Sequence, residues 1–94
     1  MTQTMTHPDT RYQDPSPVVS GILYTLAPLL PGRVRWEDTG AGAWCVTITL
    51  PDGGIRVGDT GGALGMSVRR EGVEYTRTLT PAGAVRAIMA EVER

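Results

Sequence analysis

Apolar residues recur with two different periods along this chain, and the change of period separates the predicted elements. Apolar side chains in residues 18–26 recur at helical spacing, which predicts an amphipathic helix. The pair Ser16-Pro17 is typical of a helix start, because serine caps exposed amides and proline suits the first helical position. Pro28 has no amide hydrogen to donate, so we expect this helix to end near Ala27.

A second helix is predicted at the end of the chain. Thr80-Pro81 repeats the pattern of a capping residue followed by proline, so we expect the helix to begin there. Its apolar stripe consists of Val85, Ile88, Met89 and Val92. The remaining charged positions, Glu91 among them, are expected to face solvent.

Between Arg33 and Leu79 the apolar period is two, which predicts five β-strands. The strand-like runs are residues 33–37, 44–50, 55–57, 64–69 and 73–79. Predicted turns rich in Asp, Gly and Pro lie at 38–40, 51–54, 59–62 and 71–72. Connections this short permit only antiparallel neighbours. We therefore predict an α+β fold, a two-layer, five-stranded antiparallel meander with an N-terminal and a C-terminal helix packed on one face.

Length and composition bound the domain organisation. A chain of 94 residues is too short for two independent cores, and 40% hydrophobic residues are typical of a soluble globular domain. Residues 1–15 are polar without an apolar period, which predicts a disordered tail before a single domain at 16–94. The chain has neither an apolar run near the roughly 20 residues of a membrane span nor the pattern of a secretory signal. We expect a cytoplasmic protein that makes no contact with a membrane.

The charged residues carry information about origin. The formal net charge is -1, so no global field attracts the chain to nucleic acid or membrane. All nine basic residues are arginine, and lysine, asparagine and phenylalanine are absent. This bias is typical of a GC-rich genome, bacterial or phage. The alternative is selection for guanidinium groups, which grip carboxylate or phosphate in two places.

The tripeptide Asp-Thr-Gly occurs twice, at 38–40 and at 59–61. The same tripeptide supplies the catalytic aspartates of aspartic proteases, where two carboxylates share one proton. In those enzymes the aspartate follows a buried apolar strand, whereas here Asp38 follows Trp36-Glu37 and Asp59 follows Val57-Gly58. We interpret both tripeptides as turns, in which Asp accepts local backbone bonds and Gly takes a positive φ.

The sequence lacks the residues needed for nucleophilic catalysis, a metal site or nucleotide binding. The single histidine, His7, falls in the predicted tail, so neither Cys45 nor Ser67 has an imidazole base held on the scaffold. Cys45 is expected to point away from the core and to be partly exposed. One His and one Cys cannot supply a tetrahedral metal site, and the glycines form no nucleotide fingerprint. We predict no enzyme activity, no metal and no cofactor.

The face of the sheet opposite the apolar positions carries arginine and threonine. The predicted interaction surface consists of Arg33, Arg35, Arg56, Arg69, Thr47, Thr49 and Thr76. Its four arginines against Glu37 and Glu74 leave an excess of two positive charges on a chain whose total is -1. Three interpretations remain open: a solvated sheet face, a docking surface for a protein, or a platform that contacts phosphates. The face has no aromatic ring for stacking, which disfavours single-stranded nucleic acid.

The last strand departs from the pattern in two respects. Arg77 falls in the core-facing row between Tyr75 and Leu79, so a bulge, a snorkelling side chain or a buried ion pair is expected there. The strand is also expected at an edge of the sheet, and it contains no proline to block pairing. We therefore predict a homodimer that pairs through Glu74, Thr76 and Thr78.

These observations favour a small non-catalytic protein-binding module, an accessory or inhibitor-type protein that occludes or tethers a macromolecular partner. The alternative is a weak nucleic-acid binder that uses the arginines of the open sheet face. An enzyme with carboxylates near the turns is the third hypothesis. Salt dependence separates the first two, because phosphate contacts release counterions.

Overall fold

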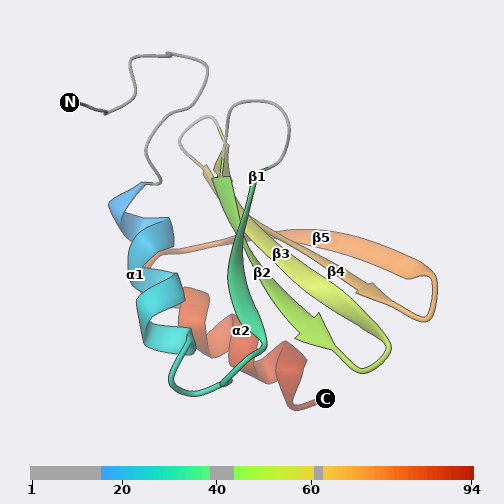
Figure 1. Ribbon diagram of the computed structural model, residues 1–94. Helices are drawn as coiled ribbons and strands as arrows, with labels where there is room; N and C mark the ends of the chain where they lie inside the picture. The colour runs from blue at the N-terminus through green and yellow to red at the C-terminus, as the bar shows by residue number, and fades with distance from the viewer. Residues whose placement is uncertain (1–15, 39–43, 61–62) are drawn as a thin grey trace.

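The computed structural model describes residues 16–38, 44–60 and 63–94 (Figure 1). The predicted tail at 1–15 lies outside the described residues, as do 39–43 and 61–62 of the predicted turns. The elements in chain order are α1 (Pro17–Leu26), β1 (Val34–Asp38), β2 (Trp44–Leu50), β3 (Gly53–Thr60), β4 (Ala63–Arg70), β5 (Val73–Leu79) and α2 (Ala84–Val92). All strand pairs are antiparallel and the sheet order is β1-β2-β3-β4-β5, so the predicted five-stranded α+β meander is confirmed.

Helix α1 begins and ends where the sequence predicts. The Ser16 hydroxyl accepts a hydrogen bond from the Val19 amide at 3.1 Å, and proline occupies the first turn. The helix ends at Leu26, because Pro28 cannot continue the ladder of amide donors. Val19, Ile22 and Leu26 share the face that packs on the sheet, and each is buried.

Helix α2 begins later than predicted. The Thr80 hydroxyl does accept a hydrogen bond from the Gly83 amide at 3.1 Å, but this bond closes a turn over 81–83. The helix starts only at Ala84, with Gly83 as its N-cap residue. The predicted start was therefore wrong by one turn, because a threonine-proline pair suits an isolated turn as well as a helix.

Strands β3 and β4 are longer than predicted, and the turn between β2 and β3 is shorter. Only Pro51 and Asp52 form the turn between β2 and β3, whereas Gly53 and Gly54 belong to β3. Gly53 has a steric reason to be glycine, since a Cβ there would lie 1.9 Å from the Arg69 carbonyl oxygen. The aspartates of the two Asp-Thr-Gly tripeptides also lie within strands, at the end of β1 and in β3. The glycines of both tripeptides lie outside the described residues.

The core lies between the two helices and one face of the sheet (Figure 1). The antiparallel register aligns the apolar side chains of neighbouring strands, as in the row Val34, Ile48, Ile55 and Val68. The largest fully buried side chains come from both layers: Leu26, Ile48, Ile55, Met66, Ile88, Val19, Val46, Val57 and Val68. The other face of the sheet, which we call the open face, is covered by neither of the two described helices (Figure 1).

The helix layer leaves most of β5 exposed, although Leu79 at its end belongs to the core. Val73, Tyr75 and Arg77 stand in the helix-facing rows, opposite residues of β4, but all three are exposed. Val73 is 66% exposed and Tyr75 is 37% exposed. Of the three expectations for Arg77, the bulge and the buried ion pair are wrong, because the register is continuous and the residue is exposed.

The end of α2 is tied to the sheet by a buried carboxylate. Glu91 is 4% exposed, which contradicts its expected solvent position. The Tyr75 hydroxyl donates to Glu91 Oε1 at 2.5 Å, and Arg94 Nη1 lies 3.3 Å from Glu91 Oε2. The Arg70 guanidinium donates to the Glu91 carbonyl oxygen and also pairs with Asp52 at 3.3 Å. Helical periodicity did not predict this role, because Tyr75, which donates to the Glu91 carboxylate, comes from the sheet.

Candidate functional site

The open face collects the predicted interaction surface in rows that run across the strands. The middle row consists of Arg35, Thr47, Arg56, Ser67 and Thr76. The row on one side consists of Glu37, Cys45, Gly58, Gly65 and Thr78. The row on the other side consists of Thr49, Gly54, Arg69 and Glu74.

Arg33 lies beside Thr49, at one end of the row that also contains Gly54, Arg69 and Glu74. It precedes β1, and its Nε donates to the Thr49 carbonyl oxygen at 3.1 Å. All of the predicted surface residues therefore lie on one face, although they come from different strands. The predicted edge residues Glu74, Thr76 and Thr78 lie on the same face of β5.

Each edge strand contributes one glutamate that reaches inward over the open face. From β1, Glu37 accepts a hydrogen bond from the Thr47 hydroxyl at 2.8 Å and pairs with Arg56 Nη2 at 3.2 Å. The hydrogen bond from Thr47, together with the positive charge of Arg56, lowers the pKa of Glu37. This carboxylate is therefore ionised at neutral pH and is held over the middle row.

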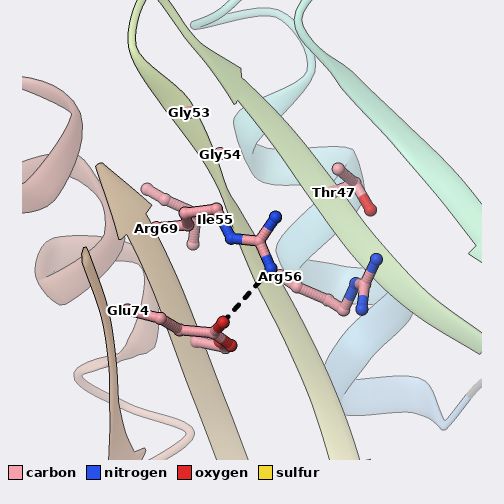
Figure 2. Close-up of a pocket in the computed structure, with 8 residues that line it drawn as sticks. Thr47, Gly53, Gly54, Ile55, Arg56, Arg69 and Glu74 are labelled. Carbon is pink, nitrogen blue, oxygen red and sulfur yellow. Dashed lines mark hydrogen bonds and ion pairs between the residues drawn. The ribbon is translucent and has the colours of Figure 1, made fainter. Parts of the chain in front are cut away.

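Glu74 of β5 is held in the same manner. It accepts a hydrogen bond from the Ser67 hydroxyl at 2.8 Å and pairs with Arg69 Nη2 at 3.3 Å (Figure 2). The hydrogen bond from Ser67, followed by that from Arg69, lowers the pKa of Glu74. Side chains of Arg56 and Arg69 remain 60% and 67% exposed, so both guanidinium groups can bind a further anion.

The middle of the open face is hollowed out around Arg56. On the central strand β3, Arg56 stands between Gly54 and Gly58, which have no side chains to fill the space beside it. A shallow hollow of about 360 Å³ lies on one side, lined by Gly54, Ser67 and Arg69 as well as Arg56 (Figure 2). A second hollow of about 480 Å³ lies on the other side and is lined by Gly58, Gly65, Thr76 and Thr78. Arg56 lines both hollows.

The fold itself does not require all of these glycines. Gly54, Gly58 and Gly65 do not have positive φ angles. A Cβ at Gly65 would lie 4.0 Å from the Arg77 carbonyl oxygen, and one at Gly58 would lie 3.5 Å from the Cys45 Cβ. Glycine inside a strand weakens it and marks places where a ligand or another backbone approaches closely. Gly54, Gly58 and Gly65 form the floor of the two hollows. This floor was not predicted, although the same alternation that selected Arg56 also places Gly54 and Gly58 beside it.

Cys45 does not behave as predicted. It lies on the open face between Glu37 and Gly58, but it is buried, with 2% exposure. Alternation along β2 predicts the face of this residue correctly, but it does not predict how deeply the short side chain is buried. Burial raises the pKa of the Cys45 thiol, which lowers its reactivity.

The arrangement of charges and hydroxyls on the open face is suited to binding an anionic group. Glu37 and Glu74 both have lowered pKa values, the opposite of what a general acid needs at neutral pH. Within the described residues, no three His, Cys, Asp or Glu side chains are grouped so that they could hold a metal ion. Exposed guanidinium and hydroxyl groups can instead form charge-assisted hydrogen bonds with carboxylates.

Comparisons with protein families, with curated proteins and with solved structures find no match to this chain. In the part of the chain that the structure describes, neither helix has the length and apolar character needed to cross a membrane.

Proposed function

We propose that this chain is a cytoplasmic, non-catalytic protein-binding module that docks an acidic segment of a partner protein on its open face. The partner would thereby be tethered or occluded, as expected of an accessory or inhibitor-type protein. The observation that carries the proposal is the position of Arg56, exposed between two hollows whose floors are built from glycine and other small residues.

Charge supports an acidic occupant. The open face carries Arg33, Arg35, Arg56 and Arg69 against Glu37 and Glu74, so it keeps an excess of two positive charges. Arginine forms bidentate bonds with carboxylates, and the hydroxyls of the middle row offer further donors beside them.

The shape of the face supports a polypeptide occupant. Because the floor lacks side chains at Gly54, Gly58 and Gly65, an extended segment can approach the backbone of the sheet closely. Both hollows are open, so they fit side chains that enter from above more than a small molecule that needs enclosure.

A weak nucleic-acid binder is the second candidate, favoured by the exposed arginines. The described residues of the open face include no aromatic side chain for base stacking. The two functions differ in salt response, because release of counterions from phosphates makes nucleic-acid binding fall steeply with salt.

The proposal is tested by variants that add a side chain to the floor of a hollow or reverse the charge of Arg56. Gly65→Val adds methyl groups to the larger hollow, and Arg56→Glu reverses the central charge, whereas Arg86→Ala removes an exposed arginine of α2 as a matched control. Each variant is immobilised and exposed to lysate of the organism that encodes the chain, and retained proteins are identified by mass spectrometry.

We expect a protein with an acidic segment that is retained by the wild type and by Arg86→Ala and is lost from the other two variants. A synthetic peptide of that segment should then bind the wild type with the same dependence on Gly65 and Arg56. Retention of the same proteins by all variants would show that the open face is not the docking surface. Retention of nucleic acid that disappears with added salt would favour the second candidate.

A further inference from the structure

Strand β5 is exposed on both faces and forms one edge of the sheet. Every residue from Val73 to Thr78 is exposed, and among the described residues β5 pairs with β4 on one side only. We propose that β5 pairs antiparallel with β5 of a second copy, about a two-fold axis at Thr76. This inference concerns a different surface from the open face and does not depend on the proposed function.

The turn between β4 and β5 determines which backbone groups of β5 point outward. Glu71 and Gly72 have φ angles of 52° and 82°, as in a two-residue type I′ turn. In such a turn the residues on either side, here Arg70 and Val73, form a hydrogen-bonded pair.

From that pair the ladder alternates between bonded and non-bonded pairs. The odd-numbered residues of β5 therefore bond β4, and the even-numbered residues direct their N–H and C=O groups to the outer edge. These residues are Glu74, Thr76 and Thr78.

Charge selects one register for the pairing of two copies. An axis at Glu74 would place two carboxylates opposite each other, and an axis at Arg77 would do the same with two guanidinium groups. An axis at Tyr75 would leave the end of the strand unpaired. The axis at Thr76 pairs the full strand without opposing like charges and forms about six inter-chain backbone hydrogen bonds.

This register also matches side chains on both faces. On the helix-facing side, Tyr75 lies opposite Arg77 of the second copy, a non-bonded pair whose close spacing allows the guanidinium to contact the aromatic ring. On the open face, Thr76 lies opposite Thr76 of the second copy, and Glu74 lies opposite Thr78 of the second copy. The exposed ring of Tyr75 is positioned by the hydrogen bond from its hydroxyl to Glu91.

The other edge strand is a poorer partner for β5. Strand β1 is shorter and carries charges at Arg35, Glu37 and Asp38. Pairing of β5 with β1 of another copy would also be a heterologous contact, which forms a larger ring or an open chain and not a two-fold dimer. Pairing of β5 with itself closes as a dimer, and the axis stands perpendicular to the sheet. Both open faces then lie on the same side of one continuous sheet.

The mass of the purified chain in solution tests the inference. Light scattering at micromolar concentration should give about twice the 10.1 kDa of one chain. Thr76→Pro removes an amide that points outward, so it should give a mass near 10.1 kDa while the circular dichroism of the fold is kept. Thr76→Ala is the matched control, because it loses the side chain and keeps the amide, and it should remain a dimer. A monomeric wild type, a monomeric Thr76→Ala or a dimeric Thr76→Pro would each overturn the inference.

Cross-linking tests the register without proline. In a Cys45→Ala background, Thr76→Cys should form an inter-chain disulfide under mild oxidation, because paired residues at the axis have a suitable Cα separation. Thr78→Cys alone should not, but it should cross-link when mixed with Glu74→Cys. Self-cross-linking by Thr78→Cys and not by Thr76→Cys would place the axis elsewhere and refute the register.

Discussion

Gly65 and Gly53 lie on neighbouring strands, yet we expect an added methyl group to change stability in opposite directions at these two positions. At Gly65 the new Cβ would lie 4.0 Å from its nearest neighbour, the Arg77 carbonyl oxygen, and the backbone has no positive φ. At Gly53 the Cβ would lie 1.9 Å from the Arg69 carbonyl oxygen, a distance that forces β3 and β4 apart.

The magnitudes follow from these distances. Replacing glycine by alanine where the backbone is already compatible stabilises a protein by about 0.4–1 kcal/mol, because the unfolded chain has less freedom to lose. For a chain of this length, Gly65→Ala should therefore raise the thermal midpoint by about 2–8 °C. Gly53→Ala must disturb ladder hydrogen bonds, so we expect a loss of about 2 kcal/mol or more in the free energy of unfolding.

Urea denaturation followed by circular dichroism measures both effects. The variants and the wild type are compared at one protein concentration, because dimerisation would make stability depend on concentration. If Gly65→Ala were as destabilising as Gly53→Ala, then the fold itself would require glycine at both positions. The glycine floor would then be no argument for a docking surface.

Three further results are expected. Ile48→Asp should abolish cooperative unfolding, because Ile48 is fully buried and an unpaired charge there is strongly destabilising; a melt like that of the wild type would mean that the faces of β2 are reversed. Glu91→Ala should cost about 1–3 kcal/mol and Tyr75→Phe should cost less, because the first removes the acceptor of a buried network and the second removes one donor; the opposite order in urea denaturation would contradict this account. Since the pKa values of Glu37 and Glu74 are lowered in the fold, their stabilising effect is present above the unfolded pKa of about 4.3 and is lost as pH falls through the folded values. Acidification should therefore lower the urea midpoint of the wild type more than that of a Thr47→Val/Ser67→Ala double variant, and an equal loss in both would argue against these hydrogen bonds.

The alternation of apolar residues was sufficient to predict the sheet, its order and the face that packs on the helices. Ser16 and Pro28 also bounded α1 correctly, since both act on the local backbone. The same local reasoning failed at Thr80, where the hydroxyl caps a turn and not the helix. A turn and the first turn of a helix use the same residues, so the sequence cannot separate them.

Long-range contacts explain the other predictions that were wrong. The alternation places Tyr75 and Arg77 in a core-facing row, but it cannot show that the helices leave most of β5 exposed. It also cannot show that Tyr75 of β5 donates a hydrogen bond to Glu91 of α2, or that Cys45 is buried. For the open face, the sequence placed the arginines together, whereas the hollows became visible only when the register set Gly58 beside Gly65.

The most direct test of the central claim is a titration of the isotope-labelled protein with a tetraglutamate peptide, followed by two-dimensional amide NMR. If the open face is a docking surface for acidic segments, amide shifts should saturate and should concentrate around Arg56, Ser67 and Thr76 in the wild type. They should be absent from Gly65→Val, whose spectrum and thermal midpoint otherwise show an intact fold, and they should not be reproduced by tetraglutamine. Shifts that spread over the helices, that persist in Gly65→Val, or that never saturate would contradict the claim.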